Sequence, residues 1–205
     1  MGVISNGTTL LDAGAIDSGI PTGAMTLIKT LTASSSGTLS FVDGASSVVF
    51  DSTYKEYLFT FNNIHAATSG AEYQFNLSID SGSNYNIAKT STAFESYHLE
   101  NDGGAGVVYQ GNADLPQGTG DQQLFRNLDT DNDCSYSGSL QLFNPSSDTF
   151  VKHYIARGNG MNTTPLSDDF YVAGYGNTTS AVNAIIFRMS SGNIDSGTIK
   201  MYGIK

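Results

Sequence analysis

The chain has 205 residues, a formal net charge of −10 and an isoelectric point of about 4.4. Only 14% of its residues are charged, whereas Ser, Thr, Asn and Gly together make up 84 of the 205. Helical proteins need many Ala, Leu, Glu and Lys residues on their surface, so this composition argues against a helix bundle and predicts an all-β protein with many turns. Nine scattered Lys and Arg residues cannot form a basic patch, so we expect no nucleic-acid partner.

The first 24 residues are rich in small side chains and show no amphipathic period. We therefore predict an extended N-terminal arm over residues 1–24, followed by a single β-domain over residues 25–205. The segment has neither the basic start nor the apolar run of a secretory signal, so we expect a protein made in a reducing cytosol, without membrane insertion. A partner chain could cover the large apolar residues of the arm, which are Val3, Ile4, Leu10, Leu11, Ile16 and Ile20.

From residue 25 onward, apolar and polar side chains alternate in short runs that predict β-strands. In chain order these runs cover residues 25–31, 39–41, 54–62, 72–79, 90–98, 107–110, 123–127, 135–143, 149–156, 170–175, 182–190 and 198–204. Residues 33–37 are predicted as a turn, and Pro116, Pro145 and Pro165 as loop residues, where proline removes no hydrogen bond from a sheet. About ten short strands with frequent turns are typical of an antiparallel β-sandwich, here expected to be jelly-roll-like.

The run at residues 72–79 has the clearest alternation and is expected to bury one face only. The apolar faces of the best runs should form the core, because side chains at every second position point to the same side of a sheet. The residues expected in this core are Phe59, Phe61, Tyr73, Phe75, Leu77, Ile185 and Phe187.

Asp129, Asp131 and Asp133 form an alternating acidic run in a predicted loop, and alternate carboxylates can converge on calcium. The sixth and twelfth positions of an EF-hand loop would hold Cys134 and Leu140 instead of Gly and Glu, so the run is not an EF-hand. A solvated acidic loop is the alternative interpretation. We expect no transition metal and no other cofactor, since the histidines lack metal-ligand spacing.

The sequence contains no nucleophile motif of a hydrolase, and the single cysteine can form no disulfide within the chain. We therefore expect a protein that is not an enzyme. Tyrosines in predicted loops could stack on sugar rings, and the candidates for such glycan contacts are Tyr85, Tyr97 and Tyr109. Tyr136, Tyr171 and Tyr175 are further candidates, and a place in the core or at a subunit interface is the alternative for all six.

Four stretches resemble a family of small virion structural proteins from tailed bacteriophages of marine cyanobacteria and other pelagic bacteria. They are residues 4–16 (ISNGTTLLDAGAI), 39–65 (LSFVDGASSVVFDSTYKEYLFTFNNIH), 140–155 (LQLFNPSSDTFVKHYI) and 173–204, which end in SSGNIDSGTIKMYGI. The closing motif is the most specific, and residues 80–135 depart most from the family.

The resemblance implies a structural component of the virion exterior, either a capsid decoration or part of a tail appendage. It supplies no catalytic residues. Its implied partners are other virion proteins and further copies of this chain, and we favour a homotrimer held to the particle by the arm. A carbohydrate-binding receptor module of a tail fibre, with a host-surface glycan as ligand, is the first alternative, and a glycan-cleaving tail enzyme is the second.

Overall fold

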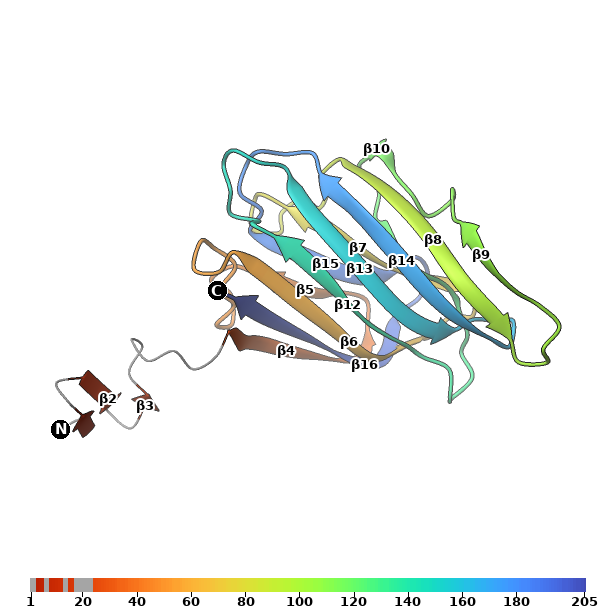
Figure 1. The fold of residues 1–205 in the computed structure, drawn as a ribbon, viewed down its shortest axis with the longest axis horizontal. Coiled ribbons are helices and arrows are strands. Elements are labelled where there is room, and N and C mark those ends of the chain that lie inside the picture. Colours follow the sequence, from red (N-terminus) through yellow and green to blue (C-terminus); the bar gives the residue numbers. More distant parts are fainter. Residues whose placement is uncertain (1–2, 6–7, 13–14, 17–23) are drawn as a thin grey trace.

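The structure is a computed structural model, and it describes residues 3–5, 8–12, 15–16 and 24–205. Figure 1 shows that this part of the chain consists of strands and loops without a helix, so none of its segments is a helix that could span a bilayer. From Met25 onward the strands form two antiparallel sheets that are packed as a sandwich. The all-β sandwich expected from composition and alternation is therefore confirmed.

The larger sheet has nine strands, eight of them in the order β10-β8-β14-β13-β12-β6-β16-β4, while β9 pairs with β8. Strands β12, β13 and β14 follow one another along the chain and form a meander in the middle of this sheet (Figure 1). The bounds are β4 (Met25–Ser36), β6 (Glu56–Ala66), β8 (Lys89–Leu99), β9 (Ala105–Tyr109), β10 (Pro116–Gly118), β12 (Tyr136–Phe143), β13 (Lys152–Met161), β14 (Leu166–Gly176) and β16 (Ile194–Ile204).

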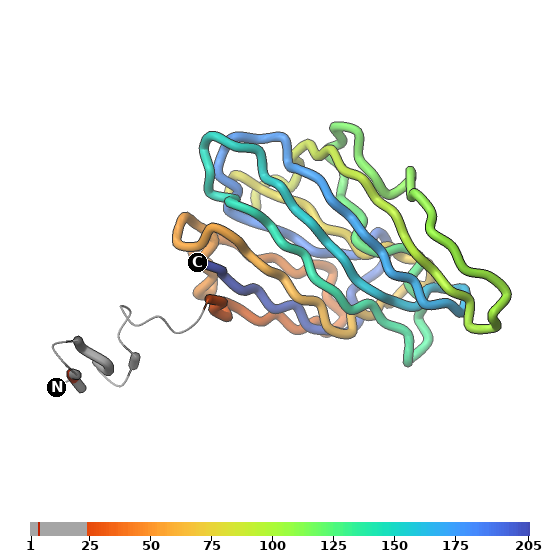
Figure 2. The backbone as a smooth tube through the Cα atoms, viewed as in Figure 1, coloured from red at the N-terminus to blue at the C-terminus, as the bar shows by residue number. Residues whose placement is uncertain are grey.

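The smaller sheet has four strands in the order β11-β7-β15-β5. Its strands are β5 (Leu39–Val42), β7 (Ala71–Ser78), β11 (Gln122–Leu128) and β15 (Ala184–Met189). The smaller sheet faces only part of the nine-stranded sheet, and the other face of the large sheet carries no further layer (Figures 1 and 2). That outer face is where the candidate site lies.

Aromatic side chains fill the space between the sheets, with Phe187 of β15 at their centre. Its ring centroid lies 5.5 Å from that of Phe59, 5.3 Å from that of Phe61 and 6.0 Å from that of Tyr73. Such pairs contribute beyond their buried area because the ring edges and faces carry opposite partial charges. The seven residues predicted for the core are each at most 1% exposed, so that prediction is confirmed.

Strand β7 differs from the expectation of a strand with one buried face. Asn76 and Ser78 are buried as well, while Ile79, just after the strand, is 41% exposed. The loop that leads into β11 covers this face, because the side-chain amide of Asn76 donates to the carbonyl oxygen of Thr119 and to Oδ1 of Asp121. Alternation in one strand could not reveal this cover, since it comes from a distant loop.

Two local predictions are wrong. The predicted turn at residues 33–37 is largely strand, since β4 runs on to Ser36 alongside the long strand β16, with Ser34 opposite Ser196. Pro116 begins strand β10 instead of lying in a loop. A proline is tolerated there because β10 is a three-residue strand at the margin of the sheet and pairs only with β8.

The described residues of the N-terminal segment form three short strands. Strands β1 (Val3–Ser5), β2 (Thr8–Asp12) and β3 (Ala15–Ile16) form an antiparallel sheet of their own, and none of them pairs with a described strand of the sandwich. The sequence between β1 and β2 is Asn-Gly, the dipeptide typical of two-residue hairpin turns. Ile4 is 64% exposed, and Ile20 lies outside the described residues.

Candidate functional site

The outer face of the large sheet carries a stacked aromatic group. Phe94 of β8 is the register partner of Tyr171 of β14, and their rings stack with centroids 4.6 Å apart and planes 5° from parallel. The guanidinium carbon of Arg157 on β13 lies 4.8 Å from the centroid of Tyr171. Asp169 accepts hydrogen bonds from Arg157 and from the hydroxyl of Tyr171. The charges of this group are thus paired with each other.

A second aromatic group lies four residues further along β14. Tyr175 is the register partner of His153 on β13, and their ring centroids are 5.9 Å apart. The side-chain amide of Gln117, at the margin of the sheet, approaches the Tyr175 hydroxyl at 3.5 Å and also donates to Thr90. These contacts orient Tyr175 toward the space beside Thr90.

Small side chains beside the second aromatic group leave a hollow of about 510 Å³, which is bordered by Phe143, His153 and Tyr175 and not by the rings of Phe94 and Tyr171. Ala173 lies between Tyr171 and Tyr175 on β14, and its register partners are Thr92 on β8 and Ile155 on β13. Ile155 is 55% exposed, although it is a large aliphatic residue in the middle of a sheet. A volume of this size falls in the range of small-molecule sites.

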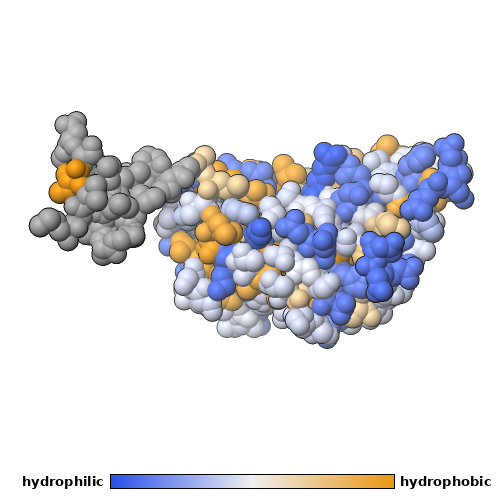
Figure 3. All heavy atoms as spheres, turned by 90° about the horizontal axis from the view of Figure 1, so that it is seen from below, coloured by the Kyte–Doolittle hydropathy of each residue, from blue (hydrophilic) through white to orange (hydrophobic). Residues whose placement is uncertain are grey.

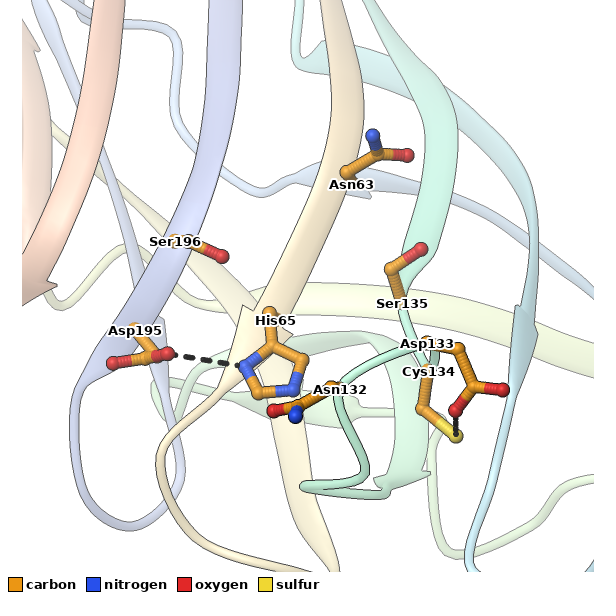
Figure 4. A pocket seen from close by; sticks show the side chains of 8 residues that line it. All are labelled: Asn63, His65, Asn132, Asp133, Cys134, Ser135, Asp195 and Ser196. Carbon is orange, nitrogen blue, oxygen red and sulfur yellow. Dashed lines mark hydrogen bonds and ion pairs between the residues drawn. The ribbon is translucent and has the colours of Figure 1, made fainter.

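A second pocket of about 400 Å³ lies at the end of β6 and is lined by polar residues (Figure 4). His65 forms an ion-pair contact with Asp195, with 3.3 Å between Nδ1 and Oδ2. On its other side Nε2 lies 3.2 Å from the carbonyl oxygen of Asp131. Both ring nitrogens therefore face acceptors, and neither is directed at a serine or cysteine, as a general base in nucleophilic catalysis requires.

Cys134 lines the same pocket but is nearly buried. Burial raises the pKa of its thiol, and the negative charges of Asp133, Asp129 and Asp131 raise it further. A thiol that resists deprotonation is a poor nucleophile. The polar contacts in this pocket therefore link β16 to the loop before β12, and they do not form a catalytic centre.

The structure does not bring the three carboxylates of the calcium candidate together. Oδ1 of Asp129 accepts from the hydroxyl of Ser69 and from the amide of Thr130, while Asp133 lies beside Cys134. In the described part of the chain no three His, Cys, Asp or Glu side chains converge as metal ligands do. Alternate positions in a loop need not share a face. The spacing of three carboxylates in the sequence was therefore not sufficient to predict a metal site here.

Two buried carboxyl groups lie on the inner faces of neighbouring strands β8 and β14. Glu95 pairs with Arg126, whose Nε donates to Oε2 at 2.7 Å. Asp168 is fully buried, and neither of its carboxyl oxygens has a hydrogen-bond partner. Burial, together with the negative charge of Glu95, raises the pKa of Asp168 to about 7. Both groups face the interior, away from the hollow on the outer face.

The three tyrosines chosen as glycan contacts do not come together. Tyr85 lies in the loop between β7 and β8, next to Gly82 and near Val42 of the smaller sheet. Tyr97 belongs to the inward-facing set of β8, and Tyr109 is an exposed residue of β9 opposite Phe94.

Of the further candidates, Tyr136 is completely buried in the core. Tyr175 lines the hollow, whereas Tyr171 lies outside it, stacked on Phe94, and both belong to the strand predicted over residues 170–175. Their four-residue spacing within one strand was the available signal, because it places both rings on one face.

Comparisons with protein-family models, with curated proteins and with solved structures find no match to this chain. The function is therefore argued from the geometry described above, together with the resemblance of the four sequence stretches.

Proposed function

We propose that the chain is a non-enzymatic structural protein of a bacteriophage virion, displayed on the particle exterior and held there through its N-terminal segment. The observation that carries the proposal is the exposed edge of the large sheet directly after that segment. Among the strands that the structure describes, β4 pairs only with β16, and Met25 and Leu27 at its start are 50% and 52% exposed. Figure 3 shows apolar atoms gathered at this end of the sandwich.

Exposed apolar residues on an open sheet edge favour a protein contact, because an added strand satisfies the free backbone groups of the edge. In this proposal the contact is made with further copies of the chain or with another virion protein. Cyclic symmetry closes such a contact without forming an open-ended fibre, and we favour a homotrimer. The capsid surface and a tail appendage are both compatible with this assembly, which takes place in the cytoplasm of the bacterial host.

Among the described residues, the groups that could act in nucleophilic or glycosidic catalysis are held in other contacts or are buried. His65 is held between two acceptors, and Cys134 is buried with a raised pKa. A glycan-cleaving enzyme needs two carboxyl groups on either side of a bound sugar. The neighbouring pair Glu95 and Asp168 is buried inside the sandwich and has no access to such a substrate.

A carbohydrate-binding module of a tail fibre is the second candidate, and one specific observation favours it. The hollow beside Tyr175 offers the rings of Tyr175 and His153 and the hydroxyl groups of Thr90 and Thr92 on an open sheet face. A particle component can carry both roles, since display on the exterior and recognition of a host glycan use different surfaces of the chain.

The structural proposal is tested on particles that lack this protein. Purified full-length chain and a variant without residues 1–24 are each incubated with such particles, and bound protein is measured after sedimentation. We expect the full chain to bind and the truncated chain to keep its β-type circular dichroism but lose binding. Equal binding of both chains would show that the N-terminal segment is not the tether, and no binding of either would contradict a place on the exterior.

A further inference from the structure

On the outer face of β8, β14, β13 and β12, side chains that are register partners line up across the strands. Such a row of side chains suits an elongated ligand. Thr92, Ala173, Ile155 and Gln141 are successive register partners across these four strands. Adjacent strands are ~4.8 Å apart, so the row spans about 14 Å. Ala173 is the smallest residue of this row, and the row is flanked on β14 by Tyr171 and Tyr175, whose Cα atoms are separated by ~13 Å. The result is a shallow channel across the strands with an aromatic residue on each side.

We propose that this channel binds a neutral glycan chain, with one sugar ring over Ala173 beside the aromatic rings of His153 and Tyr175. Phe94 and Tyr171 lie outside the hollow and are stacked on each other at the other side of Ala173. Sugar rings have apolar C–H faces that pack on aromatic rings, and hydroxyls at their edges that need hydrogen-bond partners. Thr90, Thr92 and the hydroxyl of Tyr175 supply such partners around the hollow.

The charge of the site selects among ligand classes. Among the described residues, no Asp, Glu, Lys or Arg side chain lines the hollow. Arg157 and Asp169 beside Tyr171 form a bidentate ion pair with each other, and Glu56 at the end of the row accepts a hydrogen bond from Gln141. The whole chain carries −10, so an acidic polysaccharide would be repelled and has no unpaired cation to meet here. A neutral glycan is not repelled by the negative net charge and needs no cation as a partner.

The polar groups also argue against a purely apolar occupant. Thr90 and Tyr175 already have the side-chain amide of Gln117 as a hydrogen-bond partner. A lipid chain or an apolar peptide side chain would therefore leave the hydroxyl of Thr92 buried and unsatisfied, and each such group is costly. A second copy of the chain remains a distinct occupant, and the experiment is designed to recognise it.

The inference deepens the second candidate function and does not depend on where the chain lies on a particle. It is therefore tested with the isolated full-length chain. The probes are maltohexaose, cellohexaose, laminarihexaose and mannohexaose, with hexagalacturonate as the acidic comparison. Saturation-transfer NMR detects contact, and titration calorimetry measures affinity. We expect at least one neutral hexasaccharide to bind with a Kd below about 1 mM, and hexagalacturonate not to bind.

Three variants locate the site. Tyr175→Ala removes one aromatic side of the channel and should weaken binding about tenfold. Ala173→Arg adds a long side chain at an exposed position, so it should leave the fold intact and abolish binding. Tyr85→Ala is the matched control, because it removes a tyrosine beside the smaller sheet and should leave the affinity unchanged. Circular dichroism and thermal unfolding confirm that each variant is folded.

Several results would overturn the inference. They are the absence of saturation transfer from all four neutral probes, stronger binding of hexagalacturonate, and equal affinity of the wild type and Ala173→Arg. Sedimentation velocity addresses the second copy. A wild-type dimer that Ala173→Arg converts to a monomer would show that the channel is a self-interface, and would likewise contradict glycan binding. Particle attachment plays no part in these measurements, so failure here leaves the structural proposal standing.

Discussion

Lys89 of the large sheet donates a hydrogen bond from Nζ to Oδ1 of Asn76 in the smaller sheet, across 2.6 Å. The ammonium group is fully buried, and its second partner is the carbonyl oxygen of Ile87 at 2.8 Å. Burial lowers the pKa of Lys89 to about 8, although the negative charge of Asp121 acts in the opposite direction. A buried cation that links the two sheets makes the stability of the sandwich depend on pH.

The first prediction concerns this lysine between pH 8 and 10. The folded chain binds fewer protons at Lys89 than the unfolded chain in this window, because the folded pKa is the lower one. The free energy of unfolding should therefore rise with pH, by about 1–3 kcal/mol. Lys89→Met should remove that rise, as measured by urea unfolding at pH 7, 8, 9 and 10. An identical pH dependence in the variant would contradict the assignment.

The second prediction concerns Asp168, whose pKa is raised from 3.8 to about 7. The folded chain holds a proton there that the unfolded chain has lost, so stability should fall as pH rises from about 4 to 7. Asp168→Asn should flatten this decline and stabilise the protein at pH 7 by about 2–4 kcal/mol. The exposed Asp131→Asn serves as the control and should leave the profile unchanged. A destabilised Asp168→Asn would mean that the carboxylate has an important partner.

The third prediction tests the aromatic core. Phe75 is completely buried and packs edge-on against Tyr154, with ring centroids 5.1 Å apart. Phe75→Ala should lower the free energy of unfolding by ~3–5 kcal/mol, because it removes buried apolar contact and leaves a cavity. Phe150 is 65% exposed, and Phe150→Ala should change stability by less than about 0.5 kcal/mol. Chemical denaturation of both variants measures the difference.

The fourth prediction concerns close packing at Gly158 of β13. A Cβ atom at this position would collide with the ring of Tyr136, which is completely buried and cannot move aside. Gly158→Ala should therefore destabilise the sandwich by ~1–3 kcal/mol. The matched control is Gly120→Ala, since no atom lies within 4 Å of the added Cβ there. Equal melting temperatures of the two variants would contradict this prediction, because they would show that β13 and Tyr136 can move apart without loss of stability.

Part of the candidate site could be read from the sequence, and part could not. Tyr171 and Tyr175 lie in one strand, so their shared face follows from the two-residue period of a strand. Their partners Phe94 and His153 come from other strands, and only the order β8-β14-β13 brings them together. Nothing in the sequence distinguished Tyr85, Tyr97 and Tyr109 from one another as glycan contacts. In the structure they lie in the loop between β7 and β8, in β8 and in β9, respectively, and do not form one surface.

The sequence by itself determined the class of the fold and the residues of the core. Its small polar residues disfavour helices, and alternation in single strands placed Phe75 and Phe187 inside, because side-chain direction along a strand is a local property. The tertiary structure alone decided the buried states of Lys89 and Asp168 and the channel at Ala173. These depend on strand order, register and loop cover, which arise from contacts between residues far apart in the chain and leave no period in the sequence.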